Sequence, residues 1–361
     1  MDTLPVGSPQ LVLRPFRALR LSEALVGAPV ANRVFARPYR SVPGRLRDWR
    51  RQRHLRVDLE AGLYLHEYTS AGLTVRGLVG NLDLLRAGGA VLPHEAVHTG
   101  QVTQLADRMR EMSINPAPIL LMHRGSPELR AHVERVAESA PQLVYTDRSD
   151  QLQRIWRITD SDTQAALTAD LASSRAVIAD GHHRYAAARL LRDENPTSGW
   201  ADTLVMLIDQ LDTPLQLGAI HRTVAGLTMS KVSAAAATRG DEFTSHSDRH
   251  EALERLEDAL VLHDGVHWAS VRPAEPAPLL VCSLHDQLLP AWQIAESRVG
   301  YSHTAGEALA KAGNGLAVLL PAPTFDQVAG AAAAGHLLPQ KATSFQPKPH
   351  LGAIMRDLRD G

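Results

Sequence analysis

A strand, a polar turn and a helix follow one another at residues 175–193, and this pattern constrains the fold more than any other feature of the sequence. Residues 175–179 form a strand pattern in which four apolar residues follow Arg175, and residues 185–193 have helical periodicity. The same alternation recurs from residue 91 onward, with helical patterns at 102–112, 127–139 and 162–173 and a strand pattern at 117–122. The sequence therefore predicts a mixed α/β fold.

The chain has 361 residues, which is enough for two or three domains. We expect a β-rich N-terminal extension over residues 1–90, an α/β domain over 91–220 and a C-terminal α/β domain over 221–361. The first part contains a strand pattern, a basic helix and a hairpin, at 11–16, 43–54 and 62–79. A glycine pair at 88–89 marks the first boundary, and the second lies near 215–225.

Composition narrows the classes of partner. Lysine and arginine total 38 against 39 acidic residues, so no overall positive charge is available to hold a nucleic-acid backbone. Cys282 is the single cysteine, which excludes an internal disulfide and a cysteine-based zinc site. Apolar runs such as 118–122 and 316–320 are much shorter than the roughly 18 residues that a membrane-spanning helix needs. With no signal-peptide pattern at residue 1, we expect a reduced, cytoplasmic protein.

The turn between the strand and the helix reads Asp180, Gly181, His182, His183, Arg184. The free N–H groups and the dipole at a helix N-terminus favour an anion there, and the histidines and the arginine add donors. The aspartate could orient a histidine or hold a magnesium ion. The simpler alternative is a polar turn with a capping aspartate. Because four polar groups exceed what a cap requires, we favour a phosphate site.

Residues 94–98 match H-E-x-x-H, the pattern of zinc proteases. That pattern requires a helix that places His94 and His98 on one face, whereas Pro93 and Gly100 stand close on either side. The sequence therefore disfavours zinc. Glu95 then remains as a helix cap, a solvated charge or a general base.

Lysine is rare in this chain, and two of its four lysines, Lys341 and Lys348, lie in the polar segment 339–348 together with Thr343 and Ser344. Lysine with a hydroxyl residue suits a phosphate or an amino-acid carboxylate, although a solvated loop is an equal alternative. His221 and Arg222 are expected to be a surface pair. The Ser302–His303 pair lacks the G-x-S-x-G turn of a hydrolase triad.

Together these motifs resemble the bacterial and archaeal domain-of-unknown-function family number ten-fifteen, which is related to free serine kinase and more distantly to ParB and sulfiredoxin. The resemblance implies a ParB/sulfiredoxin-like central domain. It rests on residues 13–17, 92–95, 178–186 and 338–343.

The resemblance also implies a reaction, the transfer of a terminal phosphoryl group from ADP or ATP to a hydroxyl of serine or a similar metabolite, with Mg²⁺. Glu95 matches the glutamate that serves the serine kinase as base. The turn 180–184 matches a nucleotide-phosphate loop, and His94, Lys341 and Thr343 are implied to bind substrate or phosphate. Two rivals remain at this stage: a ParB-like nucleotide-binding regulatory module without kinase activity, whose protein partner is unknown, and a zinc hydrolase.

Overall fold

The structure is a computed structural model, and it describes residues 8–36, 42–197 and 199–359. The chain divides into two compact units. Unit 1 comprises residues 1–93, 97–215 and 347–361, and unit 2 comprises residues 94–96 and 216–346. No helix among the described residues is long and apolar enough to cross a membrane.

Unit 1 is built on a nine-stranded mixed sheet with the order β6-β11-β8-β12-β5-β4-β10-β9, in which β1 also pairs with β5. A smaller four-stranded sheet has the order β3-β2-β21-β7. The strands are β1 (Leu13–Arg14), β2 (Ala18–Leu21), β3 (Leu55–Val57), β4 (Leu63–Ser70), β5 (Leu73–Asp83), β6 (Val91–Leu92), β7 (Ile114–Asn115), β8 (Ile119–His123), β9 (Leu143–Thr146), β10 (Leu152–Ile158), β11 (Ala176–Asp180), β12 (Asp202–Asp209) and β21 (Met355–Asp357).

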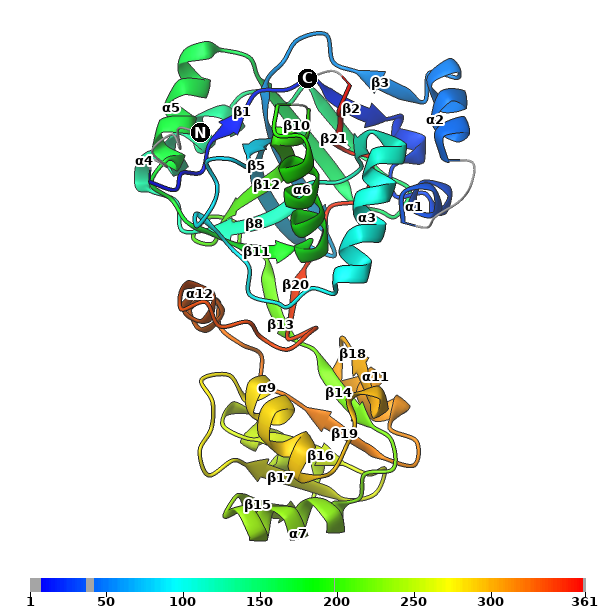
Figure 1. Cartoon of the computed structure of the whole chain (residues 1–361), viewed down its shortest axis with the longest axis vertical. Helices are drawn as coiled ribbons and strands as arrows, with labels where there is room; N and C mark the ends of the chain where they lie inside the picture. The colour runs from blue at the N-terminus through cyan, green and yellow to red at the C-terminus, as the bar shows by residue number, and fades with distance from the viewer. Residues whose placement is uncertain (1–7, 37–41, 198, 360–361) are drawn as a thin grey trace. The chain divides into compact units, whose positions relative to one another are not determined.

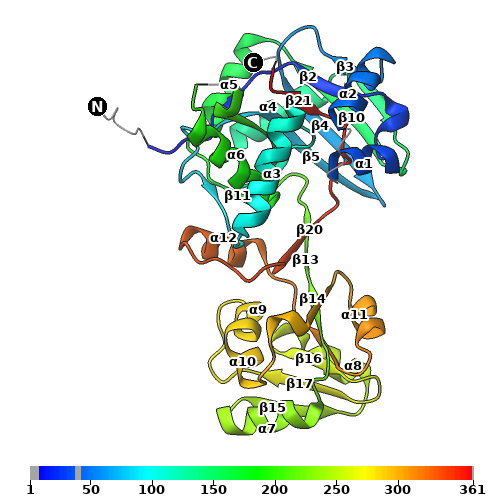
Figure 2. The same cartoon turned by 45° about the vertical axis from the view of Figure 1, so that its right-hand side comes forward.

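The helices of unit 1 are α1 (Pro29–Ala36), α2 (Val42–Arg51), α3 (Thr99–Met112), α4 (Pro127–Ala137), α5 (Ser161–Leu171) and α6 (His182–Glu194). Helices α3 and α6 lie side by side (Figures 1 and 2). Their apolar faces, including Ala106, Met109, Ala188 and Leu191, join one core with the leucine and valine side chains of the large sheet. Burial of this shared face holds the two helices together, and the candidate phosphate turn lies at the N-terminus of α6.

Unit 2 contains a six-stranded antiparallel sheet with the order β15-β17-β16-β19-β14-β18 and a separate pair, β13-β20. Its strands are β13 (Gln216–Ala219), β14 (His221–Val224), β15 (Glu242–His246), β16 (Leu260–His263), β17 (Trp268–Arg272), β18 (Val299–Ser302), β19 (Leu316–Leu319) and β20 (Thr343–Gln346). Its helices are α7 (Met229–Arg239), α8 (Arg249–Glu254), the 3₁₀ turn η3 (Arg255–Glu257), α9 (Leu280–Ser283), the π-helical turn η4 (Leu284–Leu288), α10 (Leu289–Ala291), α11 (Ala305–Lys311) and α12 (Phe325–Ala333).

The prediction of a mixed α/β chain is confirmed. The expected division at residue 90, however, is not where the structure divides, because β4 and β5 pair with β10 and β12 in one sheet. Residues 1–90 and 97–215 therefore share a core instead of forming an extension and a domain. The chain passes into unit 2 at residue 216 and returns to unit 1 at residue 347, so unit 2 differs from the expected domain over 221–361. The ParB/sulfiredoxin-like layout stays a prediction.

Candidate functional site

In unit 1, the candidate phosphate turn follows the buried strand β11. Gly181 adopts a φ of +99° and is the N-cap residue of α6. A Cβ at this position would lie 2.9 Å from Nη2 of Arg184. The sequence predicts a helix from Tyr185. In the structure α6 already begins at His182, because the left-handed conformation of Gly181 turns the chain directly into the helix. His182, His183 and Arg184 are therefore residues of the first helical turn.

Two cations neutralise the Asp180 carboxylate. Nη2 of Arg184 lies 2.6 Å from Oδ2, and Nζ of Lys348 lies 2.5 Å from Oδ1. Burial opposes ionisation of Asp180, but Arg184 and Lys348 together outweigh it and hold the pKa of the carboxyl below its ordinary value. Two cations against one carboxylate leave a net positive charge at the N-terminus of α6, which suits an anion.

Arg184 is anchored inside unit 1. Its Nη1 donates to the backbone oxygens of Ala117 and Pro118, each at 2.9 Å, while Nη2 holds Asp180. This arrangement fits a residue that fixes the turn better than one that reaches a ligand. The Lys348 side chain is 45% exposed, so it is the more accessible cation of the two.

The two histidines of the turn differ in their surroundings. Burial lowers the pKa of His182 to about 4, so its imidazole is neutral at pH 7. His183 accepts the backbone N–H of His98 at 3.2 Å through Nε2, and burial together with His98 lowers its pKa as well. His98 is the N-cap residue of α3, so this bond ties the N-termini of α3 and α6 together.

Magnesium does not fit Asp180 as a direct ligand, because both carboxylate oxygens are held by cations. The described residues contain no group of three or more His, Cys, Asp or Glu side chains suited to a metal ion. The H-E-x-x-H pattern also lacks the geometry that a zinc protease requires. Residues 93–98 are not helical, so His94 and His98 do not share a helix face.

In unit 2, Glu95 lies in a short parallel bridge with Leu338. Its Oε1 accepts the backbone N–H of Ala342 at 3.2 Å and the hydroxyl of Thr343 at 3.4 Å. Nε2 of His94 lies 2.9 Å from the same hydroxyl. Three of the predicted residues, His94, Glu95 and Thr343, are thus in direct contact.

The environment of Glu95 makes it a better base than an exposed carboxylate. Burial raises its pKa above the ordinary value, and the hydrogen bonds from Thr343 and Ala342 and the charge of Arg222 only partly offset this effect. A raised pKa brings a carboxylate closer to the operating pH, which is the condition for general-base catalysis.

Lys341 lies in the turn before β20 with a φ of +52°. Its Nζ is 4.9 Å from the centroid of the Tyr301 ring, a cation–π distance. Lys341 thus belongs to the segment that contacts Glu95 through Ala342 and Thr343. Its ammonium group faces the Tyr301 ring.

The structure corrects the interpretation of Arg222, which is fully buried and not part of a surface pair. Its Nη1 donates to the backbone oxygen of Ile220 at 2.5 Å, its Nη2 to that of Gln340 at 3.4 Å, and its Nε to Nε2 of His285 at 3.1 Å. Burial lowers its pKa to about 10, so it still carries a charge at pH 7. No local sequence pattern signals this role, because Arg222 stands between the polar residues His221 and Thr223.

A family model described as "Protein of unknown function (DUF1015)" matches residues 11–288. The chain belongs to the DUF1015 family. The match contains both Glu95 and the turn 180–184, and it ends before Lys341 and Thr343. No curated protein matches the sequence.

Several solved structures are similar to this DUF1015 chain at low identity. A mutant of free serine kinase in complex with ADP is 16% identical, covers 78% of this chain and 91% of its own, and has a TM-score of 0.45. A conserved hypothetical protein from Pyrococcus furiosus is 16% identical, with coverages of 79% and 96% and a TM-score of 0.42. SbnI from Staphylococcus aureus, with a C-terminal truncation, is 10% identical, with coverages of 76% and 85% and a TM-score of 0.45.

Proposed function

We propose that this DUF1015 protein is a nucleotide-dependent small-molecule kinase. It transfers the terminal phosphoryl group of ADP or ATP to a hydroxyl of serine or a similar metabolite. The observation that carries the proposal is the half-buried Glu95 carboxylate, which has a raised pKa and accepts the Thr343 hydroxyl, itself in contact with His94. The reaction class itself comes from the motif resemblance.

In the proposed reaction, Glu95 accepts the proton of the acceptor hydroxyl as that oxygen attacks the terminal phosphorus. A new P–O bond forms, and the P–O bond to the leaving AMP or ADP breaks. The leaving nucleotide keeps the electron pair of that bond. General-base assistance of this kind contributes roughly 10²–10⁴-fold to a rate.

The nucleotide phosphates bind, in this proposal, at the turn of unit 1. Lys348 and the N–H groups of the first turn of α6 supply the positive field, and Arg184 keeps Asp180 and the turn in place. Lys341 and Thr343 are proposed to contact the acceptor or its phosphate. Electrostatic stabilisation of the transferring group is the main contribution of such a site.

Two variants test the proposal by separating binding from chemistry. Glu95→Gln keeps the size of the side chain but removes the base, so turnover falls by about 10²-fold or more while the Kd for ADP stays unchanged. Lys348→Met removes a cation from the phosphate turn, so ADP binding weakens. Calorimetric titration with ADP and a coupled turnover assay measure the two effects. Lys311→Met, in α11, is the matched control and leaves both unchanged.

The rival function, a nucleotide-binding regulatory module, predicts another outcome from the same experiment. The wild type then binds ADP but turns over no hydroxyl compound, and Glu95→Gln is indistinguishable from it. That pattern would refute the kinase proposal and retain the phosphate turn.

A further inference from the structure

Residues 347–350 carry Lys348 to the phosphate turn of unit 1. They lie outside the helices and strands, so pairing within a helix or a sheet does not fix their backbone. The ammonium group of Lys348 nevertheless has a defined partner, because its Nζ pairs with Oδ1 of Asp180. A lysine side chain has many rotamers, and a mobile backbone would add to them. Side chains from elsewhere in unit 1 therefore have to hold this segment if Lys348 is to stay at the turn.

Tyr68, in strand β4, holds the start of the segment. Its side chain is fully buried, and its hydroxyl donates to the backbone oxygen of Pro347 at 2.8 Å. Burial raises the pKa of Tyr68, and the charge of Asp180 adds to the rise, so the hydroxyl remains a donor at neutral pH. A buried tyrosine hydroxyl usually has a hydrogen-bond partner, and here that partner is the residue before Lys348.

Gln151, in the turn between β9 and β10, holds the segment at Lys348 itself. Its Nε2 donates to the backbone oxygen of Lys348 at 3.0 Å, and its Oε1 accepts the backbone N–H of His350 at 3.0 Å. The residue is 1% exposed, so water does not compete for these bonds. Because both ends of one amide are engaged, the backbone from Lys348 to His350 cannot rotate without breaking a hydrogen bond.

The Asp147 carboxylate fixes the far end of the segment. Nδ1 of His350 lies 2.6 Å from Oδ2 of Asp147, and Nε2 of Gln153 donates to the same oxygen at 2.8 Å. Gln153 also donates to Oε1 of Gln151 at 2.8 Å, so the two anchors belong to one network. Asp147, Gln151 and Gln153 are all buried. Hydrogen bonds are stronger in such surroundings than in water, and networks of them rigidify the backbone that they contact.

We infer that Tyr68 and Gln151 are positioning residues for the nucleotide. They hold residues 347–350 so that the ammonium group of Lys348 stands at the phosphate turn before the nucleotide arrives. A cation held in advance loses little freedom when it meets a phosphate, so binding costs less entropy. This role rests on the proposed function, in which Lys348 supplies positive charge to the nucleotide phosphates, and it adds two residues that lie outside the motifs behind that function.

Calorimetric titration of the full chain with ADP tests whether the two residues act through Lys348. Tyr68→Phe removes one hydroxyl and Gln151→Met removes both bonds of the amide, and each weakens ADP binding about three- to tenfold. In a Lys348→Met background neither substitution weakens binding further, because the cation that they place is gone. Equal losses in both backgrounds indicate a merely structural role and overturn the inference. If Gln151→Met misfolds by circular dichroism, Tyr68→Phe alone decides.

Tyr64→Phe is the matched control for Tyr68→Phe. Tyr64 lies on the same strand and is buried to the same degree, but its hydroxyl accepts the N–H of Ala18 at 3.0 Å and donates to Oδ2 of Asp58 at 2.9 Å. Its loss removes hydrogen bonds from unit 1 without touching residues 347–350. We expect a lower free energy of unfolding and wild-type affinity for ADP.

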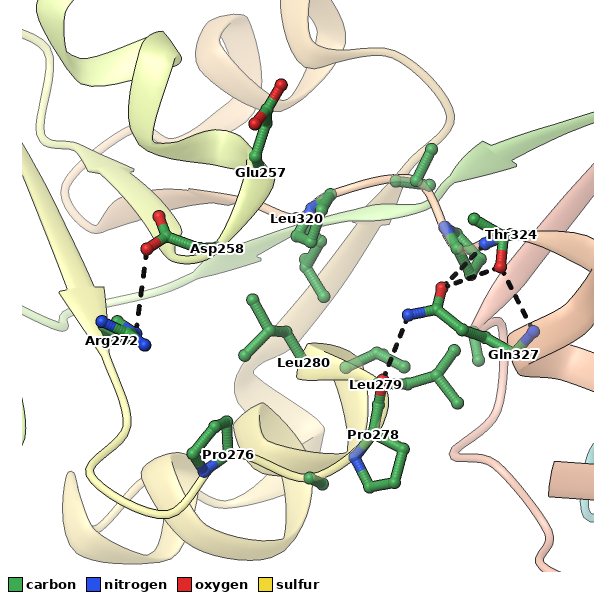
Figure 3. A pocket seen from close by; sticks show the side chains of 17 residues that line it. Glu257, Asp258, Arg272, Pro276, Pro278, Leu279, Leu280, Leu320, Thr324 and Gln327 are labelled. Atoms are coloured by element: carbon green, nitrogen blue, oxygen red, sulfur yellow. Dashed lines mark hydrogen bonds and ion pairs between the residues drawn. The ribbon is translucent and has the colours of Figure 1, made fainter. Parts of the chain in front are cut away.

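Gln327→Met is the matched control for Gln151→Met. Gln327 lines a pocket of unit 2, and its amide joins two backbone groups as that of Gln151 does (Figure 3). Its Nε2 donates to the oxygen of Pro278 at 3.3 Å, and its Oε1 accepts the N–H of Thr324 at 2.9 Å. The substitution removes an equivalent bridge away from the phosphate turn, so the affinity for ADP stays at the wild-type value.

A second measurement observes Lys348 without any nucleotide. The chain has four lysines, so labelling lysine with carbon-13 at the ε-carbon gives four NMR signals from that position. The signal that is missing in Lys348→Met belongs to Lys348. Asp180→Asn breaks the ion pair and gives the position of the same signal when the ammonium group is released.

In Tyr68→Phe and in Gln151→Met, the Lys348 signal moves from its wild-type position toward the position in Asp180→Asn. The two controls leave it in place. A Lys348 signal that keeps its wild-type position in both variants overturns the inference, even if ADP binds. A wild type that binds no ADP refutes the proposed function instead, and the lysine signals still decide whether Tyr68 and Gln151 position Lys348.

Discussion

At Glu95, burial and hydrogen bonding act in opposite directions on a single carboxylate. Burial raises its pKa, and Thr343, Ala342 and Arg222 lower it without cancelling the rise. A base acts in its deprotonated form, so the proposed activity increases as the pH rises through this pKa. Any change that removes a stabilising hydrogen bond from the carboxylate must move that limb of the pH profile upward.

Thr343→Val makes that change at one atom. The variant loses the hydroxyl that donates to Glu95, so we expect the acid limb of kcat/KM to move to higher pH. Ser344→Ala is the matched control, because the Ser344 hydroxyl contacts Nδ1 of His303 and not Glu95. A limb that stays in place, or moves to lower pH, contradicts the assignment of Glu95 as the base.

The burial of Arg222 could not be predicted from the sequence. Burial of an arginine depends on acceptors that are distant in the chain, here Gln340 and His285, and no local pattern shows them. Lys348 is a milder case. The scarcity of lysine marks the segment 339–348 as a candidate site. The ion pair between Lys348 and Asp180, 168 residues apart, is visible only in the folded structure.

Among the elements, α6 depends on one backbone conformation. Gly181→Ala places a Cβ at a φ of +99°, close to the guanidinium of Arg184. We expect a loss of about 1–3 kcal/mol in the free energy of unfolding, together with weaker ADP binding. Urea unfolding and ADP titration measure the two effects.

Gly100→Ala is the control for that substitution. Gly100 lies in the first turn of α3, and nothing stands within 4 Å of an added Cβ. Its replacement by alanine is expected to be neutral or stabilising by up to about 1 kcal/mol. If both glycine variants lose stability equally, the special conformation of Gly181 is not the cause.

Local periodicity predicted several elements of unit 1, including the hairpin β4–β5 and the strand–turn–helix at β11 and α6. The small sheet β3-β2-β21-β7 could not be predicted from the sequence, because its strands are two to four residues long and come from distant parts of the chain. Such strands exist only through tertiary pairing.

On the scale of the whole molecule, the chain passes between its two units at several points. The sequence patterns indicate only the passage near residue 216. Lys341 belongs to unit 2 and Lys348 to unit 1, although both lie in one polar segment. Residues 94–96 likewise belong to unit 2, while their neighbours on either side belong to unit 1. The α/β class was predictable, because it depends on local alternation, whereas the division into units depends on long-range pairing.

Buried histidines give the whole molecule a predictable response to acid. Burial lowers the pKa of His66, His182 and His285 to about 4 from the ordinary value of 6.5. The unfolded chain binds these protons first, so stability is lost as the pH falls from about 6.5 toward 4. Each histidine lowers the free energy of unfolding by about 1–2 kcal/mol at pH 5 relative to pH 7.5. Urea unfolding at the two pH values measures the difference.

His66→Gln tests this response at one position, and it should make the free energy of unfolding less sensitive to pH. The exposed His250→Gln serves as control, because its imidazole is solvated in both the folded and the unfolded chain. An equal pH dependence in the wild type and in His66→Gln speaks against burial of a neutral imidazole at this position.

The most direct test of the central claim is a phosphorus NMR time course of the full chain with magnesium chloride, ADP or ATP, and a pool of L-serine and related hydroxy compounds. The account predicts a new phosphomonoester signal that grows as the nucleotide is consumed and that is absent with Glu95→Gln. An unchanged nucleotide spectrum with the wild type, or an equal phosphomonoester signal with Glu95→Gln, would contradict it.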